Sequence, residues 1–247
     1  MNVAVGNDVV DLKRTRIKDL ASNERFLKRI FSVRERRAID NSGDVSLEIW
    51  SHWAAKEAGF KAISKVVSPT PPFVHADFRI SWPRKTSLLE TSNGSVIRTG
   101  TVSYNGLGAE VTVALWPDRV HATAYVRTPA EPGVVEIKTR VELLNKPDSS
   151  WSGSFQELMS RLSARELGVV YSRESAAVRV GARKDLAALL RVEEKRVEIV
   201  CELGPSGKLP PQVLIDGHPA NADVSLSHDG RWIAWVVRAN NIPGEAS

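Results

Sequence analysis

The sequence has a single cysteine, Cys201, and no long apolar segment among its 247 residues. One cysteine cannot form a disulfide within the chain, so we expect a protein of a reducing compartment, the cytoplasm. No apolar run approaches the roughly 20 residues that a membrane-spanning helix needs. Asp8 also interrupts the amino terminus too early for the apolar region of a signal peptide. We therefore expect neither a secreted protein nor a membrane partner.

Several signatures of phosphate and nucleic-acid binding are also missing. The chain has no P-loop and no glycine-rich kinase motif. Its basic residues are scattered and form no stripe, although the net charge of +5 favours acidic partners. The densest basic cluster lies in NERFLKRIFSVRERRAI, residues 23–39. This cluster is either a solvated helix face or a docking surface for an acidic protein or for phosphates.

The order of the predicted elements is that of an α+β protein. The valine-rich segment NVAVGNDVVDL predicts a strand that ends near Asp8. Helix formers predict helices over residues 22–40 and 46–65, the second ending before SPTPP. Further strands are expected at residues 73–82, 95–104 and 110–126, and RTPAEPG (127–133) is typical of a linker.

Three segments before this linker have counterparts after it, in the same order. VVDLKRTR (9–16) matches GVVEIKTR (133–140), AAKEAGFKA (54–62) matches ARKDLAALL (182–190), and residues 109–126 match residues 222–237. The matches predict two similar α+β halves, residues 1–127 and 128–247. The first half has Ala114-Leu115 where the second has Ser227-His228, and the second lacks a counterpart of Asp8. This division predicts one site to which each half contributes different groups.

Two carboxylates and a lysine in the first half suit a metal and a phosphate. Glu57 and Lys61 are four residues apart and share one helix face, which by itself indicates no more than a helix ion pair. Together, Asp8 and Glu57 offer the oxygen ligands that Mg²⁺ prefers, and Lys61 suits a phosphate oxygen. Asp11 would face the opposite side of a regular strand and is a weaker candidate ligand. His228 lies in SLSHDG, whose adjacent Ser, His and Asp cannot form a hydrolytic triad.

These motifs resemble those of the 4'-phosphopantetheinyl transferases. GNDVVDLKR and WAAKEAGFKAISK are similar to the family's Gly-x-Asp strand and its Trp-x-x-Lys-Glu-Ala helix, which ends in a lysine. RFLKRIFSVRE resembles the helix that leads to a phenylalanine-and-glutamate turn. GKLPPQVLIDG and VSLSHDGRW resemble the Gly-Lys-Pro segment and the Ser-His turn. The first half alone is similar to the small holo-acyl-carrier-protein synthases.

The resemblance implies a coenzyme A molecule in a cleft between two halves of a pseudo-twofold fold, and a protein that works as a monomer. It implies that Asp8 and Glu57 hold Mg²⁺, that Glu57 helps to deprotonate a serine of a carrier protein, and that Lys61 stabilises the departing 3',5'-ADP. It also implies coenzyme A contacts from both halves: Ser227, His228, Lys208, Arg14 and Lys56.

Two departures from the family pattern leave alternatives open. The order of the halves is reversed relative to the two-lobed members, and Val10 stands where those members carry an acidic residue. Water or Asp11 would then complete the metal coordination. A member of the fold that binds coenzyme A or a carrier protein without turnover therefore remains an alternative. A basic nucleic-acid-binding protein and a different Mg²⁺-dependent phosphotransferase are further alternatives.

Overall fold

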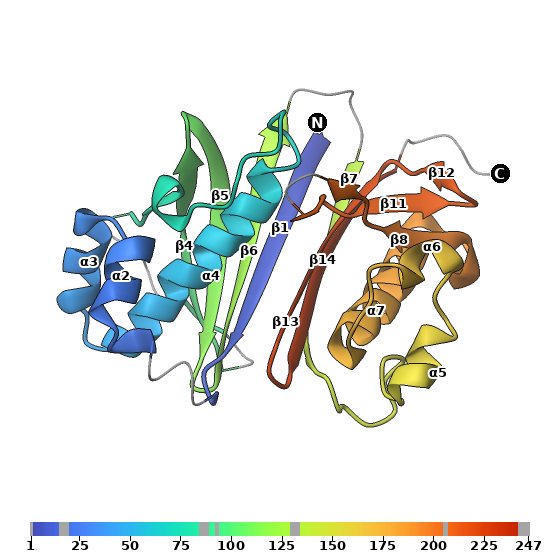
Figure 1. Cartoon of the computed structure of the whole chain (residues 1–247), viewed down its shortest axis with the longest axis horizontal. Coiled ribbons are helices and arrows are strands. Elements are labelled where there is room, and N and C mark those ends of the chain that lie inside the picture. Colours follow the sequence, from blue (N-terminus) through green and yellow to red (C-terminus); the bar gives the residue numbers. More distant parts are fainter. Residues whose placement is uncertain are drawn as a thin grey trace. The chain divides into compact units, whose positions relative to one another are not determined.

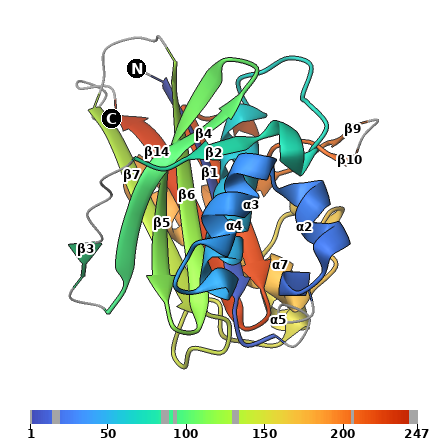
Figure 2. The ribbon, with the colours of Figure 1, turned by 90° about the vertical axis from the view of Figure 1, so that its left-hand side faces the viewer.

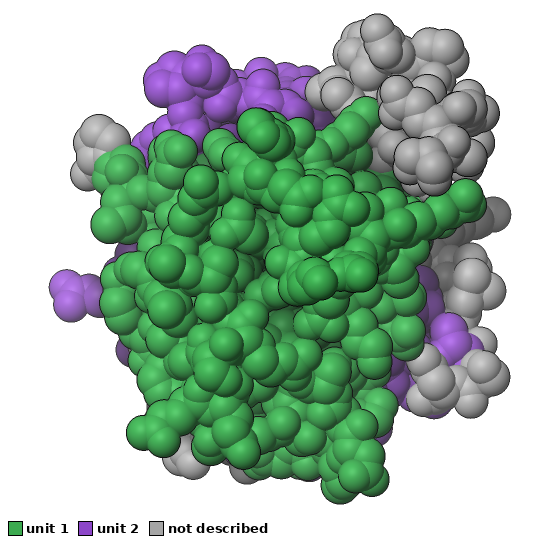
Figure 3. Space-filling view, turned by 90° about the vertical axis from the view of Figure 1, so that its right-hand side faces the viewer, with its two compact units in different colours: residues 1–5, 127–247 green, residues 6–126 purple. Residues whose placement is uncertain are grey.

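The structure is a computed structural model that describes residues 2–14, 20–83, 89–91, 94–128, 134–204 and 207–241. The chain divides into two compact units (Figure 3). The amino-terminal unit consists of residues 6–126, and the carboxy-terminal unit of residues 1–5 and 127–247. Residues 129–133 of the predicted linker lie outside the described residues.

The amino-terminal unit contains an antiparallel sheet with the strand order β1-β6-β5-β4-β2, with β3 paired to β4. The helix α4 (Val45–Ile63) lies across one face of this sheet (Figure 2). The strands are β1 (Asn2–Asp11), β2 (Arg79–Ser81), β3 (Leu89–Glu90), β4 (Val96–Tyr104), β5 (Leu107–Trp116) and β6 (Arg119–Thr128). The other elements are the helices α2 (Glu24–Ile30) and α3 (Val33–Asp40) and the 3-10 helix η1 (His75–Asp77).

The bounds of α4 follow from its sequence, and the predicted helix over residues 46–65 is confirmed. The Asp44 side chain caps the helix by accepting the N–H of Leu47 at 2.9 Å. By contrast, the helix expected over residues 22–40 is two helices, because the chain is extended at Phe31 and Ser32. Ser32 starts α3 with a capping box in which its hydroxyl accepts the N–H of Glu35.

The carboxy-terminal unit repeats the plan of a long helix on an antiparallel sheet (Figure 1). The helix α7 (Arg173–Leu190) packs against a sheet with the order β7-β14-β13. These strands are β7 (Val134–Leu143), β13 (Ala222–Asp229) and β14 (Trp232–Asn241). Shorter elements complete the unit: α5 (Phe155–Met159), α6 (Ala164–Leu167), η2 (Glu194–Arg196), β8 (Val197–Val200), β9 (Leu203–Gly204), β10 (Gly207–Lys208), β11 (Gln212–Ile215) and β12 (His218–Pro219).

The two units therefore have equivalent cores, which confirms the α+β fold with two similar halves. The strand order β1-β6-β5 beside α4 corresponds to β7-β14-β13 beside α7. Counted from the start of each helix, Glu57 and Asp185 are both residue 13, in the register of the sequence match, whereas the buried cations Lys56 and Arg183 are residues 12 and 11. The hairpins β5-β6 and β13-β14 are also equivalent, in agreement with the match of residues 109–126 to 222–237.

The predicted match of the first strands is wrong in register. Leu12 and Leu144 each donate a backbone N–H to the carbonyl at the turn of the neighbouring hairpin, at 3.0 and 2.8 Å. This equivalence places Arg140, and no carboxylate, at the counterpart of Asp8. The sequence match had aligned similar charged residues, whereas the register of a strand is set by its hydrogen bonds.

A buried carboxylate joins three elements in the amino-terminal unit. Glu35 is 3% exposed. Its Oε1 accepts the N–H of Ile80 at 2.9 Å, and its Oε2 accepts the N–H of Ser32 at 2.7 Å and Nζ of Lys56 at 2.8 Å. The ammonium of Lys56 also donates to two backbone carbonyls, those of Ile30 at 3.0 Å and His75 at 3.1 Å.

The carboxy-terminal unit contains the same arrangement around Glu166. Its Oε1 accepts the N–H of Ile199 at 3.0 Å, and its Oε2 accepts the N–H of Ser163 at 2.9 Å and Nη1 of Arg183 at 3.3 Å. The guanidinium of Arg183 also donates to two backbone carbonyls, those of Arg161 at 2.6 Å and Glu194 at 3.1 Å. FSVRE (31–35) and LSARE (162–166) are thus one motif used twice, which the sequence analysis missed.

Among the described residues, no helix combines the length and the apolar composition that a membrane span requires.

Candidate active site

Asp8 and Lys61 form an ion pair between β1 and α4. Nζ of Lys61 lies 3.0 Å from Oδ1 of Asp8 and also donates to the backbone carbonyl of Asn7 at 2.9 Å. The side chains are 11% and 27% exposed, so the pair is mostly but not fully withdrawn from water. Asp8 lies inside β1, which continues to Asp11, so the expectation that the strand ends near Asp8 is wrong.

Gly6 explains how a helical lysine reaches this strand. A Cβ atom at Gly6 would lie 2.0 Å from the carbonyl oxygen of Ala58 and 2.7 Å from the backbone nitrogen of Ala62. Only a residue without a side chain allows α4 to lie this close to β1. The Gly-x-Asp spacing therefore brings the helix within hydrogen-bonding distance of Asp8.

Glu57 lies one turn before Lys61 and contacts His75. Nε2 of the imidazole lies 3.4 Å from Oε1 of Glu57. The ring of His75 lies between Trp53 and Phe73, with centroid distances of 4.3 and 4.0 Å. This aromatic stack fixes the imidazole beside the carboxylate. The sequence analysis did not identify His75, and its only local signal is a histidine in the proline-rich segment before β2.

His121 is a second histidine that the sequence analysis missed. It lies on β6, paired with Ala114 of β5, and is 4% exposed. Burial lowers the pKa of His121 to about 3, and the positive charges of Arg119 and Lys61 add to the effect. The imidazole is therefore neutral at pH 7, and the positive charges near it are those of Arg119 and Lys61.

Asp11 is turned toward its own backbone. Its Oδ1 accepts the N–H of Lys13 at 3.0 Å, and the backbone N–H of Arg14 donates to the Asp11 carbonyl at 3.2 Å. Val10 is buried in the sheet. Over the described residues, no three His, Cys, Asp or Glu side chains converge as a ready-made metal site. Asp8 and Glu57 remain the candidate protein ligands.

Lys56 is separated from solvent and has a structural role. Its side chain is 0% exposed, and its three hydrogen bonds use all three ammonium hydrogens. Burial acts to raise the pKa of Glu35, but the Lys56 ammonium and the N–H groups of Ile80 and Ser32 outweigh it and hold that pKa below its usual range. We therefore correct the expectation that Lys56 contacts a cofactor, because it has no hydrogen left to donate.

Ser227 and His228 lie in the carboxy-terminal unit, in β13. They pair with Ala234 and Ile233 of β14, so they belong to the strand and not to the turn that was expected. Ser227 is buried and His228 is exposed. The pKa of Glu174, in the first turn of α7, is lowered mainly by its own backbone N–H, with His228 adding to the effect. The imidazole therefore lies near the amino-terminal end of α7.

Lys208 lies in β10 of the same unit. Nζ of Lys208 donates to the carbonyl of Val169 at 2.7 Å and lies 5.1 Å from the centre of the Tyr171 ring. One carbonyl leaves ammonium hydrogens for a further acceptor.

Residues 4–114 match the family model of the 4'-phosphopantetheinyl transferase superfamily. This part of the chain is similar to that superfamily. The superfamily match spans the segment from β1 into β5, and it includes Asp8, Glu57 and Lys61.

Three solved structures of acyl-carrier-protein synthases are similar to this chain. The Neisseria meningitidis enzyme is 18% identical over 51% of this chain and 98% of its own, with a TM-score of 0.35. The Thermotoga maritima enzyme is 18% identical over 89% of this chain and 86% of its own, with a TM-score of 0.35. The Mycobacterium tuberculosis acyl carrier protein synthase is 23% identical over 52% of this chain and 100% of its own, with a TM-score of 0.32.

Proposed function

We propose that the protein transfers 4'-phosphopantetheine from coenzyme A to a serine of a carrier protein and releases 3',5'-ADP. The arrangement that supports this proposal is Asp8, Glu57 and Lys61 on two adjoining elements, within the segment that matches the superfamily model. Phosphoryl transfer depends on charge neutralisation and alignment more than on covalent chemistry, and these three side chains offer both.

Asp8 and Glu57 fit Mg²⁺ by the chemistry of their donors. Carboxylate oxygens are hard ligands, and a site with two of them leaves positions for water and phosphate oxygens. When bound, Mg²⁺ would neutralise charge on the pyrophosphate of coenzyme A. The Lys61 ammonium lies 3.0 Å from Oδ1 of Asp8 and places a positive charge beside the metal-binding carboxylates and the phosphate.

The reaction needs one proton acceptor and one group that stabilises the leaving phosphate. The serine oxygen of the carrier forms a bond to the phosphorus next to pantetheine, and the bond from that phosphorus to the 3',5'-ADP oxygen breaks. Glu57 accepts the serine proton, directly or through water, with His75 orienting the carboxylate. Lys61 stabilises the negative charge on the departing phosphate.

In this proposal, side chains from both units bind coenzyme A. Ser227 and His228 bind its 3'-phosphate and pantetheine side, with Lys208 and Arg14 as further phosphate contacts. Carrier proteins are acidic, so the net charge of +5 favours their capture. A monomer would then contain one complete site.

Mass spectrometry of a small panel of apo-carrier proteins tests the proposal. Each carrier, from fatty-acid, polyketide and nonribosomal-peptide systems, is incubated with the protein, coenzyme A and Mg²⁺. We expect one carrier to gain the mass of a single phosphopantetheine arm, and no gain when Mg²⁺ is chelated. Binding of coenzyme A without a mass gain in any carrier would instead support a non-catalytic member of the fold.

A further inference from the structure

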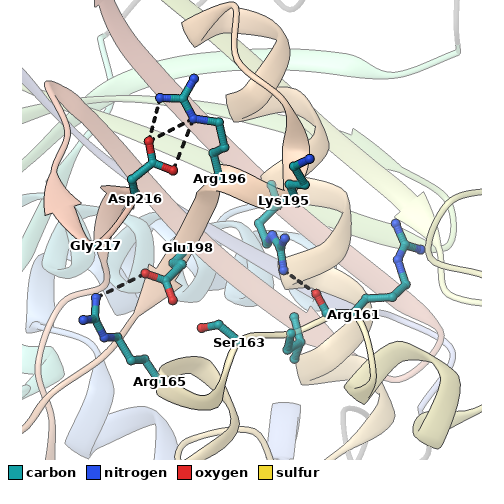
Figure 4. Close-up of a pocket in the computed structure, with 10 residues that line it drawn as sticks. Arg161, Ser163, Arg165, Lys195, Arg196, Glu198, Asp216 and Gly217 are labelled. Atoms are coloured by element: carbon teal, nitrogen blue, oxygen red, sulfur yellow. Dashed lines mark hydrogen bonds and ion pairs between the residues drawn. The ribbon is translucent and has the colours of Figure 1, made fainter.

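A pocket of about 470 Å³ lies within the carboxy-terminal unit (Figure 4). One of its lining residues, Ser163, donates its backbone N–H to the buried carboxylate of Glu166. More cations than carboxylates line this pocket, and the two carboxylates are Glu198 and Asp216. The cations that line the pocket are Arg161, Arg165, Arg183, Lys195 and Arg196. Its size lies in the range of small-molecule sites, which is roughly 300–1,000 Å³.

The wall of this pocket contains two buried donors without an acceptor in the described protein. Arg183 is 6% exposed, and its Nε has no hydrogen-bond partner there, although its other nitrogens are bonded. The hydroxyl of Ser163 is likewise buried: its oxygen faces the N–H of Glu166 in the capping box of α6, and its hydrogen has no acceptor in the described protein. Buried polar groups are normally satisfied, so two unsatisfied donors at one pocket indicate a place for an acceptor-rich ligand.

The rim supplies further donors that remain available. Arg165 lies 3.3 Å from Glu198, and its side chain is 60% exposed. Lys195 pairs with Glu193 at 2.7 Å, and its side chain is 81% exposed. Exposed ion pairs of this kind contribute at most about 1 kcal/mol, so these cations can turn to an incoming anion at little cost.

The equivalent place in the amino-terminal unit has fewer cations, because only Arg34 and Lys56, the counterparts of Arg165 and Arg183, are basic there. The buried ion pairs of Lys56 with Glu35 and of Arg183 with Glu166 have the same hydrogen-bonding pattern. The positions that correspond to Arg161, Lys195 and Arg196 are occupied there by neutral or acidic residues: Ile30, Ala76 and Asp77. Three of the five cations of the lining, Arg161, Lys195 and Arg196, are therefore particular to the carboxy-terminal unit.

We infer that this pocket binds a phosphate-bearing small molecule through Arg165, Lys195 and the hydroxyl of Ser163. Guanidinium and ammonium groups are the usual partners of phosphate, and a hydroxyl adds a directed donor. This site is additional to the coenzyme A contacts proposed above, which involve Ser227, His228 and other residues outside this lining.

Titration of the full chain with pyrophosphate, followed by ¹H–¹⁵N NMR at constant ionic strength, tests the inference. We expect saturable shifts of the amide signals of Ser163, Arg165 and Gly217. The variants Arg165→Gln and Lys195→Gln should each weaken the affinity at this site by roughly 10-fold, the loss of one charge-assisted hydrogen bond. Lys146→Gln removes a comparable ion-paired cation of the same unit and should leave the affinity unchanged.

Two results would overturn the inference. Shifts that rise linearly without saturation, or that are equally large with Lys146→Gln and Arg165→Gln, would mean that pyrophosphate is attracted only by the general positive charge. Saturable shifts confined to Ser227 and His228 would mean that pyrophosphate occupies the proposed coenzyme A contacts and leaves this pocket empty.

Discussion

Glu166 occupies in the carboxy-terminal unit the place that Glu35 has in the amino-terminal unit. Each carboxylate accepts the backbone N–H of a serine that starts a helix and the N–H of an isoleucine in a strand. Each also pairs with a buried cation of the long helix, Lys56 or Arg183. In each unit, one buried carboxylate therefore holds together the start of a short helix, a strand and the long helix.

Removing one partner of this buried pair should be strongly destabilising. Lys56→Met leaves the Glu35 carboxylate buried without its cation, so we expect the free energy of unfolding to fall by about 3–5 kcal/mol. Urea denaturation measures the loss. The double variant Lys56→Met, Glu35→Gln should lose less than the single variant, and Lys146→Gln, which breaks an exposed pair, should lose less than ~1 kcal/mol. Equal losses in all three would contradict a special role for this pair.

The close approach of α4 to β1 makes Gly6 intolerant of any side chain. Gly6→Ala places a methyl group 2.0 Å from the carbonyl oxygen of Ala58, so the helix must move away from the strand. We expect a loss of roughly 1–3 kcal/mol or more in unfolding free energy, together with reduced transfer because Lys61 is displaced from Asp8. Gly43→Ala is the control, since a Cβ there meets no atom within 4 Å. A stable and fully active Gly6→Ala protein would refute the role given to this glycine.

The buried, neutral His121 predicts a loss of stability in acid. Burial lowers its pKa from 6.5 to about 3, so the unfolded chain binds a proton between these pH values and the folded chain does not. Protonation then favours unfolding, and the free energy of unfolding contributed by this residue falls as the pH drops from 6.5, by up to about 1.4 kcal/mol per unit. His121→Gln should remove this contribution. Unfolding curves of both proteins between pH 7 and pH 4 that differ by a constant amount would show that His121 does not titrate as stated.

Glu57→Gln tests the proton acceptor of the proposed transfer. The amide retains the shape of the side chain but cannot accept the serine proton, so we expect kcat to fall by roughly 10²–10⁴-fold with the fold retained. Rates are measured from the mass gain of the carrier, and circular dichroism checks the fold. Glu142→Gln, which removes a carboxylate paired with Lys146, should have normal activity. Normal turnover of Glu57→Gln would eliminate this residue as base and metal ligand.

His228→Ala tests the coenzyme A contact on the other unit. Loss of one hydrogen bond to a charged phosphate is worth about 1.5–3 kcal/mol, so KM for coenzyme A should rise by roughly 10- to 100-fold, and kcat should change less. His218→Ala removes another exposed histidine of the same unit and should leave KM unchanged. An effect of His228→Ala on carrier affinity alone would show that this histidine contacts the carrier and not the phosphate.

The sequence predicted the elements that have strong local signals. The helix α4 has a capping aspartate and an uninterrupted run of helix formers, and the β5-β6 hairpin has an apolar run on each side of a proline turn. Asp8 and Lys61 were identified because the spacing of their motifs is specific, and the structure brings them together.

The buried charges could not be recognised from the sequence in the same way. Glu35 lies among arginines that were interpreted as a solvated or docking face, and its segment was compared only with a phenylalanine-and-glutamate turn, yet its side chain is 3% exposed. Lys56 was interpreted as a coenzyme A contact from the family resemblance, whereas it points away from Glu57 because successive helical residues point in different directions. The signal that identifies Glu35 is the repeated Ser-x-Arg-Glu motif, which becomes visible only when the two units are aligned by their hydrogen bonds.

The first residues of β1 have a further consequence for dissecting the chain. The carbonyl of Val3 accepts Nε of the buried Arg238 at 3.0 Å, and the N–H of Val5 donates to Asp223 at 2.8 Å. A truncated protein that starts at residue 127 would retain Arg238 and Asp223 but would lose their main-chain partners, the carbonyl of Val3 and the N–H of Val5. Residues 127–247 therefore do not form a self-sufficient unit. A chimaera that takes these residues from one protein should also take residues 1–5 from the same protein.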